Sequence, residues 1–92
     1  MQIKESEVGV DYMNAIEEVL KIRKERFKVY GDSFLEDGIE DLLVYVKGKI
    51  NRYKYQKKLG TENNSYEKSK DCLIDLVNYA LFILAKELKN EK

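Results

Sequence analysis

One segment restricts the fold of this chain more than any other: between residues 71 and 85 the sequence is almost entirely apolar or aromatic. Its strongly polar side chains are Asp71, Asp75 and Asn78. At about 100° per residue on an α-helix, these three fall within a stripe roughly 60° wide. A helix that is apolar around most of its circumference is normally buried, and buried carboxylates are unfavourable unless a cation or hydrogen bonds satisfy them. The polar stripe is therefore the first candidate functional feature.

The remaining sequence has the pattern of a small all-α protein. Apolar residues recur at helical spacing in three segments, and the chain has no proline that would interrupt them. Gly31 is placed to end the first helix, and the composition of residues 60–64 is typical of a turn. We expect helices at residues 11–30, 35–59 and 65–89, with Asp11 as a cap of the first and Asn64 or Ser65 as a cap of the third.

Three long helices with short connections predict an antiparallel bundle in a single domain, residues 1–92. Such a bundle does not easily cover a third helix that is apolar on almost every side. We therefore expect a homodimer that completes a larger bundle. Gly38 and Gly48 weaken the second helix by roughly 1 kcal/mol each relative to alanine, and a close approach of two helices would explain their presence.

Charge and composition exclude several classes of protein. The 17 basic and 17 acidic residues balance, so neither nucleic acid nor an anionic membrane is an expected partner. The longest apolar stretch is too short to span a bilayer. Cys72 is the only cysteine and the N-terminus lacks a signal-peptide pattern, so we expect a cytoplasmic protein. Because histidine is absent, catalysis would depend on carboxylates, other polar side chains or a metal ion.

The carboxylates of the stripe have two explanations. Asp71 and Asp75 are i, i+4 neighbours, so their side chains share one helix face about 5–6 Å apart at Cβ. Two adjacent carboxylates of this kind can hold Mg²⁺, which takes carboxylate oxygens and keeps positions for substrate phosphates. Alternatively, Asp71 is exposed in the first turns of the helix and Asp75 pairs with a lysine or arginine from a neighbouring helix.

The second helix carries a polar face of its own, formed by Asp41, Tyr45, Lys49, Arg52 and Gln56. Lys49 and Arg52 can hold a phosphate, or they can pair with the aspartates of the stripe. The plain alternative is a solvated face with weak ion pairs. Asp37 and Glu40 open this helix, where acidic residues complement the helix macrodipole. The turn at residues 30–34 suits a helix end, and its backbone N–H groups also suit an anion.

Three short motifs resemble a known family when taken in order. They are Tyr-Gly-Asp at residues 30–32, Lys-x-x-Arg at 49–52 and Asp-x-x-x-Asp-x-x-x-Tyr-Ala at 71–80. Over roughly residues 12–88 the chain resembles the nucleotide-modification-associated helical domain, a family often found in phages. That family is similar to the MazG-like all-α nucleoside triphosphate pyrophosphohydrolases.

The resemblance implies an oligomeric helical bundle that uses Mg²⁺ or Mn²⁺, binds a nucleoside triphosphate and cleaves it to a monophosphate and pyrophosphate. Asp71 and Asp75 would be the catalytic metal ligands, joined by the pair Asp37 and Glu40. Phosphates and nucleotide would contact Lys49, Arg52, Tyr30, Asp32, Asn78 and Tyr79. The chain departs from the MazG pattern at Cys72, where that pattern has a glutamate three residues before the second aspartate. A nucleotide-binding protein without full hydrolysis agrees with this departure. The alternative outside the family is a non-catalytic dimerisation or adaptor module, in which the stripe is a buried polar network.

Overall fold

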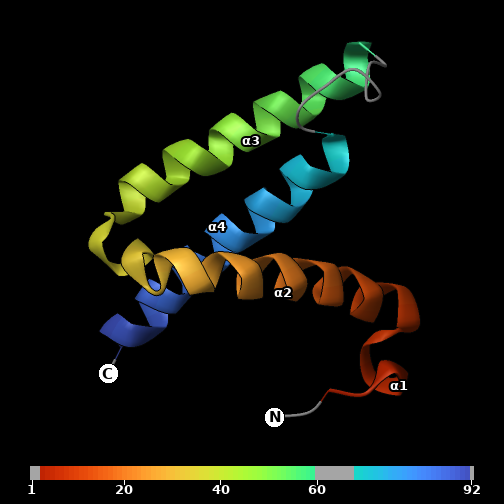
Figure 1. Cartoon of the computed structure of the whole chain (residues 1–92), viewed down its shortest axis with the longest axis horizontal. Coiled ribbons are helices and arrows are strands. Elements are labelled where there is room, and N and C mark those ends of the chain that lie inside the picture. The colour runs from red at the N-terminus through yellow and green to blue at the C-terminus, as the bar shows by residue number, and fades with distance from the viewer. Residues whose placement is uncertain (1–2, 60–67, 92) are drawn as a thin grey trace. The chain divides into compact units, whose positions relative to one another are not determined.

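The structure of the protein, a computed structural model, describes residues 3–59 and 68–91 (Figure 1). All the elements it contains there are helical, which confirms the predicted all-α class with three long helices. The predicted turn at residues 60–64 and the caps Asn64 and Ser65 lie outside the described residues. Contacts within the chain divide it into two compact units, Met1–Gly31 and Asp32–Lys92. The prediction of one domain stays a prediction, and each unit is described by itself.

The first unit contains a short and a long helix. Residues before the first predicted helix form α1 (Glu5–Val8), and α2 (Val10–Tyr30) begins directly after Gly9. Gly9 has a φ of +93°, which turns the chain between the two helices. The expected cap Asp11 therefore lies inside the first turn of α2, so that prediction is wrong. At the other end the prediction is confirmed, because the Gly31 N–H donates to the Phe27 carbonyl at 2.9 Å.

The second unit begins with a short 3₁₀ helix, η1 (Ser33–Glu36), followed by α3 (Ile39–Leu59). The second helix was predicted to start at residue 35, so it begins four residues later than expected. Two i→i−3 hydrogen bonds cause the difference: Leu35 N–H donates to the Asp32 carbonyl, and Asp37 N–H donates to that of Phe34. Asp37 is then extended, and the first turn of α3 closes on the Gly38 carbonyl.

Two long helices of this unit, α3 and α4 (Ser69–Asn90), pack against each other (Figure 1). Tyr45 stacks on Tyr79, and Lys49 contacts Asp75. The residue numbers rise along α3 while they fall along α4, so the pair is antiparallel. At the end of the pair η1 contacts α4, where Phe34 stacks on Phe82 with ring centroids 4.4 Å apart.

The core between these helices is small. Leu42 on α3 and Cys72 on α4 are its most completely buried side chains, at 1% and 0% exposure. Among the apolar residues that recur at helical spacing in α3, Leu42 is buried but Leu43 and Ile50 are exposed, while Lys49 faces α4. The reason is that Leu42 and Lys49 share the face of α3 that contacts α4, whereas Leu43 and Ile50 lie about 100° around the helix from that face. Gly48 is exposed with open space around its position for a Cβ, so it does not mark a close helix approach.

The third predicted helix, α4, was expected to be buried on nearly every side, because its residues are apolar around most of its circumference. Its α3-facing side is buried, but several of its leucines are exposed. Within the second unit, α3 and η1 pack on only one side of α4. No helix within residues 3–59 and 68–91 has the length and apolar content needed to cross a membrane.

Candidate functional site

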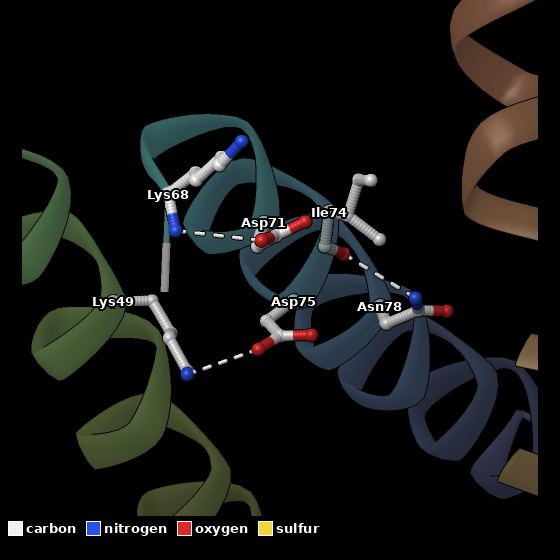
Figure 2. A network of polar contacts seen from close by, with 6 residues as sticks. All are labelled: Lys49, Lys68, Asp71, Ile74, Asp75 and Asn78. Carbon is white, nitrogen blue, oxygen red and sulfur yellow. Dashed lines mark hydrogen bonds and ion pairs between the residues drawn. The ribbon is translucent and has the colours of Figure 1, made fainter. Parts of the chain in front are cut away.

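The centre of the polar stripe is an ion pair between α3 and α4. Lys49 Nζ lies 2.9 Å from Asp75 Oδ2, and the two side chains point toward each other from the facing helices (Figure 2). The Lys49 side chain keeps 20% of its accessible surface and the Asp75 side chain 11%. Since a carboxylate enclosed to this degree requires a compensating charge, Lys49 explains why Asp75 is tolerated there. For Asp75, therefore, the pairing expected as one alternative is present.

Asp71 lies one turn earlier on α4 and makes a different contact. Its Oδ2 accepts a 3.3 Å hydrogen bond from the backbone N–H of Lys68, the residue just before the helix (Figure 2). Asp71 is exposed, and a carboxylate in the first turn also complements the helix macrodipole. Asp71 and Asp75 thus lie on one side of α4, as an i, i+4 pair must, but one stabilises the start of the helix and the other the contact with α3.

Asn78 completes the stripe from a buried position, with 4% exposure. Its Nδ2 donates a 3.3 Å hydrogen bond to the Ile74 carbonyl one turn back along α4. This bond satisfies part of the buried amide without any contribution from another helix. A hydrogen bond within α4 therefore explains how the polar side chain of Asn78 is accommodated in a buried position.

An aromatic cluster continues the contact from the ion pair toward η1. The Tyr45 and Tyr79 rings stack with centroids 5.1 Å apart, and Tyr79 meets Phe82 edge-on at 6.0 Å. Beyond Phe82, the Lys86 ammonium donates a 2.8 Å hydrogen bond to the Leu35 carbonyl. Sequence reasoning singled out Tyr79, and Phe34 as part of the turn at residues 30–34, but it missed the contacts of Phe82 and Lys86. The spacing of 79, 82 and 86 on the same face as Asp75 was the available signal.

Other predicted site residues lie elsewhere. Glu40 is exposed in the first turn of α3, whereas Asp37, predicted to open that helix, is exposed in the extended segment before it. Glu40 precedes Lys49 by nine residues, which is about 13 Å along a helix axis, so it does not lie beside the ion pair. Asp32 is exposed before η1, whereas Tyr30 is the exposed last residue of α2 in the other unit. Arg52 is exposed on α3, one turn beyond Lys49.

The side chains that could hold a metal ion are consequently few. Across the part of the chain that the structure describes, no group of three or more histidine, cysteine, aspartate or glutamate side chains is arranged to hold one. Asp71 and Asp75 are the predicted ligands that lie closest along one helix face.

Comparisons with known proteins add no family to this description. No protein-family model matches the chain, and no curated protein or solved structure is significantly similar to it. The residues and contacts described above are therefore the basis of any functional assignment.

Proposed function

We propose that α3 and α4 form a binding site for the magnesium-bound triphosphate of a nucleoside triphosphate, as in the MazG-like pyrophosphohydrolases that the sequence resembles. The observation that carries this proposal is the Lys49–Asp75 contact at 2.9 Å. It places a phosphate-binding type of cation against a metal-binding type of anion, on facing helices and partly shielded from water. In such a shielded place, the attraction of Lys49 to a phosphate and the attraction of Asp75 to a metal ion are both stronger than in bulk water.

The residues at this place fit a magnesium ion that is shared with a substrate. Asp71 and Asp75 supply two carboxylates from one side of α4, and Mg²⁺ in phosphate sites commonly takes one or two carboxylates plus phosphate oxygens and water. When bound, the ion (Mg²⁺ or Mn²⁺) neutralises charge on the phosphates and polarises the bond to be cleaved. Lys49 would turn from Asp75 to a phosphate oxygen, and Arg52, one turn away, would contribute a second cation.

The nucleoside part of the ligand has fewer supporting contacts. Tyr79 presents a ring next to the ion pair, although that ring is already stacked on Tyr45. Within one chain, Asp37 and Glu40 do not reach the ion pair, so the acidic residues of full two-metal hydrolysis are not assembled there. For this reason we propose nucleotide binding as the primary activity, in a cytoplasmic homo-oligomer.

A second candidate function is a non-catalytic helical association module. It is favoured by the same ion pair, since Lys49 already compensates Asp75 without any ligand. In that case the pair fixes the register of α3 against α4, a use of buried polar groups that is known from other helical assemblies. Metal ions and nucleotides would then leave the protein unaffected.

Thermal unfolding with and without ligand separates the two candidates. We expect MgCl₂ or MnCl₂ together with a nucleoside triphosphate to raise the melting temperature, because a ligand at 100 times its Kd stabilises the folded state by about 2.7 kcal/mol. A panel of standard and modified deoxynucleoside triphosphates, followed by pyrophosphate release, identifies the substrate and any turnover.

Asp75→Asn is the test variant and Asp11→Asn, at an exposed aspartate of α2, is the matched control. The nucleotide proposal requires that Asp75→Asn abolishes the ligand-induced shift while Asp11→Asn retains it. If no nucleotide or metal changes the melting temperature of the unmodified chain, nucleotide binding is refuted and the association module remains.

A further inference from the structure

The side of α4 that faces away from α3 carries an apolar face of its own. We call it the leucine face; its members are 38–52% exposed, and they are Leu73, Val77, Leu81, Leu84 and Leu88. At about 100° per residue they fall within an arc of roughly 80°. Asp75, Tyr79 and Lys86, which contact α3 or η1, lie on roughly the opposite side of the helix. Within the second unit, α3 and η1 pack on that opposite side of α4, so neither of them covers the leucine face.

The spacing of the leucine face is the same when read in either direction. With Ala80 included, its members follow one another at intervals of four, three, one, three and four residues. A two-fold axis between Ala80 and Leu81 in an antiparallel helix pair thus sets Leu73 opposite the partner's Leu88. It also sets Val77 opposite the partner's Leu84. A surface that matches itself in this way is what a symmetric dimer interface requires.

The charges at the two ends of the face follow the same symmetry. Lys70 lies in line with the leucine face before Leu73, and Glu91 lies in line with it after Leu88. Both residues are exposed. In the antiparallel pair Lys70 lies opposite the partner's Glu91 at each end, whereas a parallel pair would set like charges side by side. Opposite charges across an interface select the orientation of the partners.

We infer that the leucine face of α4 is the contact surface for a second copy of this chain, which packs α4 antiparallel on α4 about an axis between Ala80 and Leu81. This inference rests on the proposed homo-oligomer and specifies its surface and register. The Lys49–Asp75 pair lies on the other side of α4, so this contact leaves the proposed nucleotide site uncovered. Self-association and nucleotide binding can therefore succeed or fail independently.

Sedimentation of the full chain over a range of concentrations measures the association. Leu81→Glu sets two carboxylates beside the two-fold axis in an apolar contact, and we expect it to weaken the dimer at least 100-fold. The matched control is Val44→Glu, which makes the same kind of change at a residue of α3 that is 67% exposed. We expect the control to leave the dimer unchanged, and circular dichroism checks that each variant retains its helices.

Cysteine cross-linking tests the register without depending on Leu81→Glu. Leu73 and Leu88 are 15 residues apart, about 22 Å along the helix, so in the antiparallel pair neither position lies near its own copy. We expect disulfide-linked dimers when Leu73→Cys chains are mixed with Leu88→Cys chains, and none from either variant alone. The unmodified chain, with Cys72 buried, gives the background.

Each result decides the inference. Mixed-pair cross-links together with dissociation by Leu81→Glu support it. A chain that is monomeric at all concentrations, with the leucine face covered by another part of itself, overturns it. So does a dimer that Val44→Glu dissociates and Leu81→Glu does not, or cross-linking of Leu73→Cys with itself. The nucleotide-dependent melting shift is measured separately and does not change with these outcomes.

Discussion

Replacing Asp75 by asparagine removes the negative charge of the central ion pair while keeping the size of the side chain. Lys49 then faces a neutral amide in place of the carboxylate whose Oδ2 lies 2.9 Å from its ammonium group. At that distance, and with an effective dielectric constant of about 20, the Coulomb attraction is about 6 kcal/mol. The free energy needed to remove both charges from water offsets most of this attraction.

The net effect follows from how far each side chain is enclosed. Loss of one partner from a fully buried pair costs about 3–5 kcal/mol. The Lys49 side chain is 20% exposed, so its ammonium group can turn toward water along its flexible stem. We therefore expect a coupling energy of about 2 kcal/mol between Lys49 and Asp75. In a domain of this size, a loss of about 2 kcal/mol from the free energy of unfolding lowers the melting temperature by about 8–16 °C.

A double-mutant cycle measures this coupling directly. Urea unfolding is followed by circular dichroism for the unmodified chain, Asp75→Asn, Lys49→Gln and the double variant, in the absence of nucleotide and divalent metal. Asp71→Asn serves as the control, since loss of an exposed negative charge in the first turn of a helix costs about 0.3–1 kcal/mol. A coupling energy below about 0.5 kcal/mol would match an ordinary surface pair and would refute the reasoning that burial makes this contact strong.

Three further substitutions test the fold by the same unfolding measurement. Gly48→Ala should raise the free energy of unfolding by about 0.8–1 kcal/mol, because the added methyl group meets open space in a helix; a decrease would contradict this. Gly31→Ala should lower it by about 1–2 kcal/mol, since its φ of +53° is unfavourable for alanine; an unchanged value would show that the turn rearranges. Leu42→Ala should lower it by about 2–5 kcal/mol, and Leu43→Ala, at an exposed position, by far less. Equal losses at Leu42 and Leu43 would place the core elsewhere.

The fold was predictable where local chemistry decides it. Gly31 ends α2 through the hydrogen bond that a glycine after a helix commonly makes, and the apolar spacing identified all three long helices. The start of α3 was not predictable in the same way. Residues 33–36 can continue either as an α-helix or as a 3₁₀ turn, and the contact of Phe34 with Phe82, far away in sequence, is present only in the folded unit.

Only part of the candidate site was predictable, because its residues lie on two different helices. The position of Asp75 on an apolar helix indicated that it needs a partner, but periodicity could not choose among the cations of the second helix. The antiparallel register chooses Lys49, because the stacking of Tyr45 on Tyr79 one turn away sets Lys49 at the level of Asp75. The same register keeps Glu40 away from that carboxylate. Spacing along one helix therefore predicts neighbours on that helix, whereas contacts between helices depend on a register that only packing determines.

The complete burial of Cys72 makes its thiol a natural reporter of motion in the second unit. A thiol reagent can modify this side chain only while its cover is open, so the modification rate equals the intrinsic rate of the exposed thiol multiplied by the fraction of open molecules. Cys72 is one turn or less from both Asp71 and Asp75 along α4. Its reaction rate therefore measures the fraction of molecules in which the helix that carries these two carboxylates has separated from the side chains that cover the thiol.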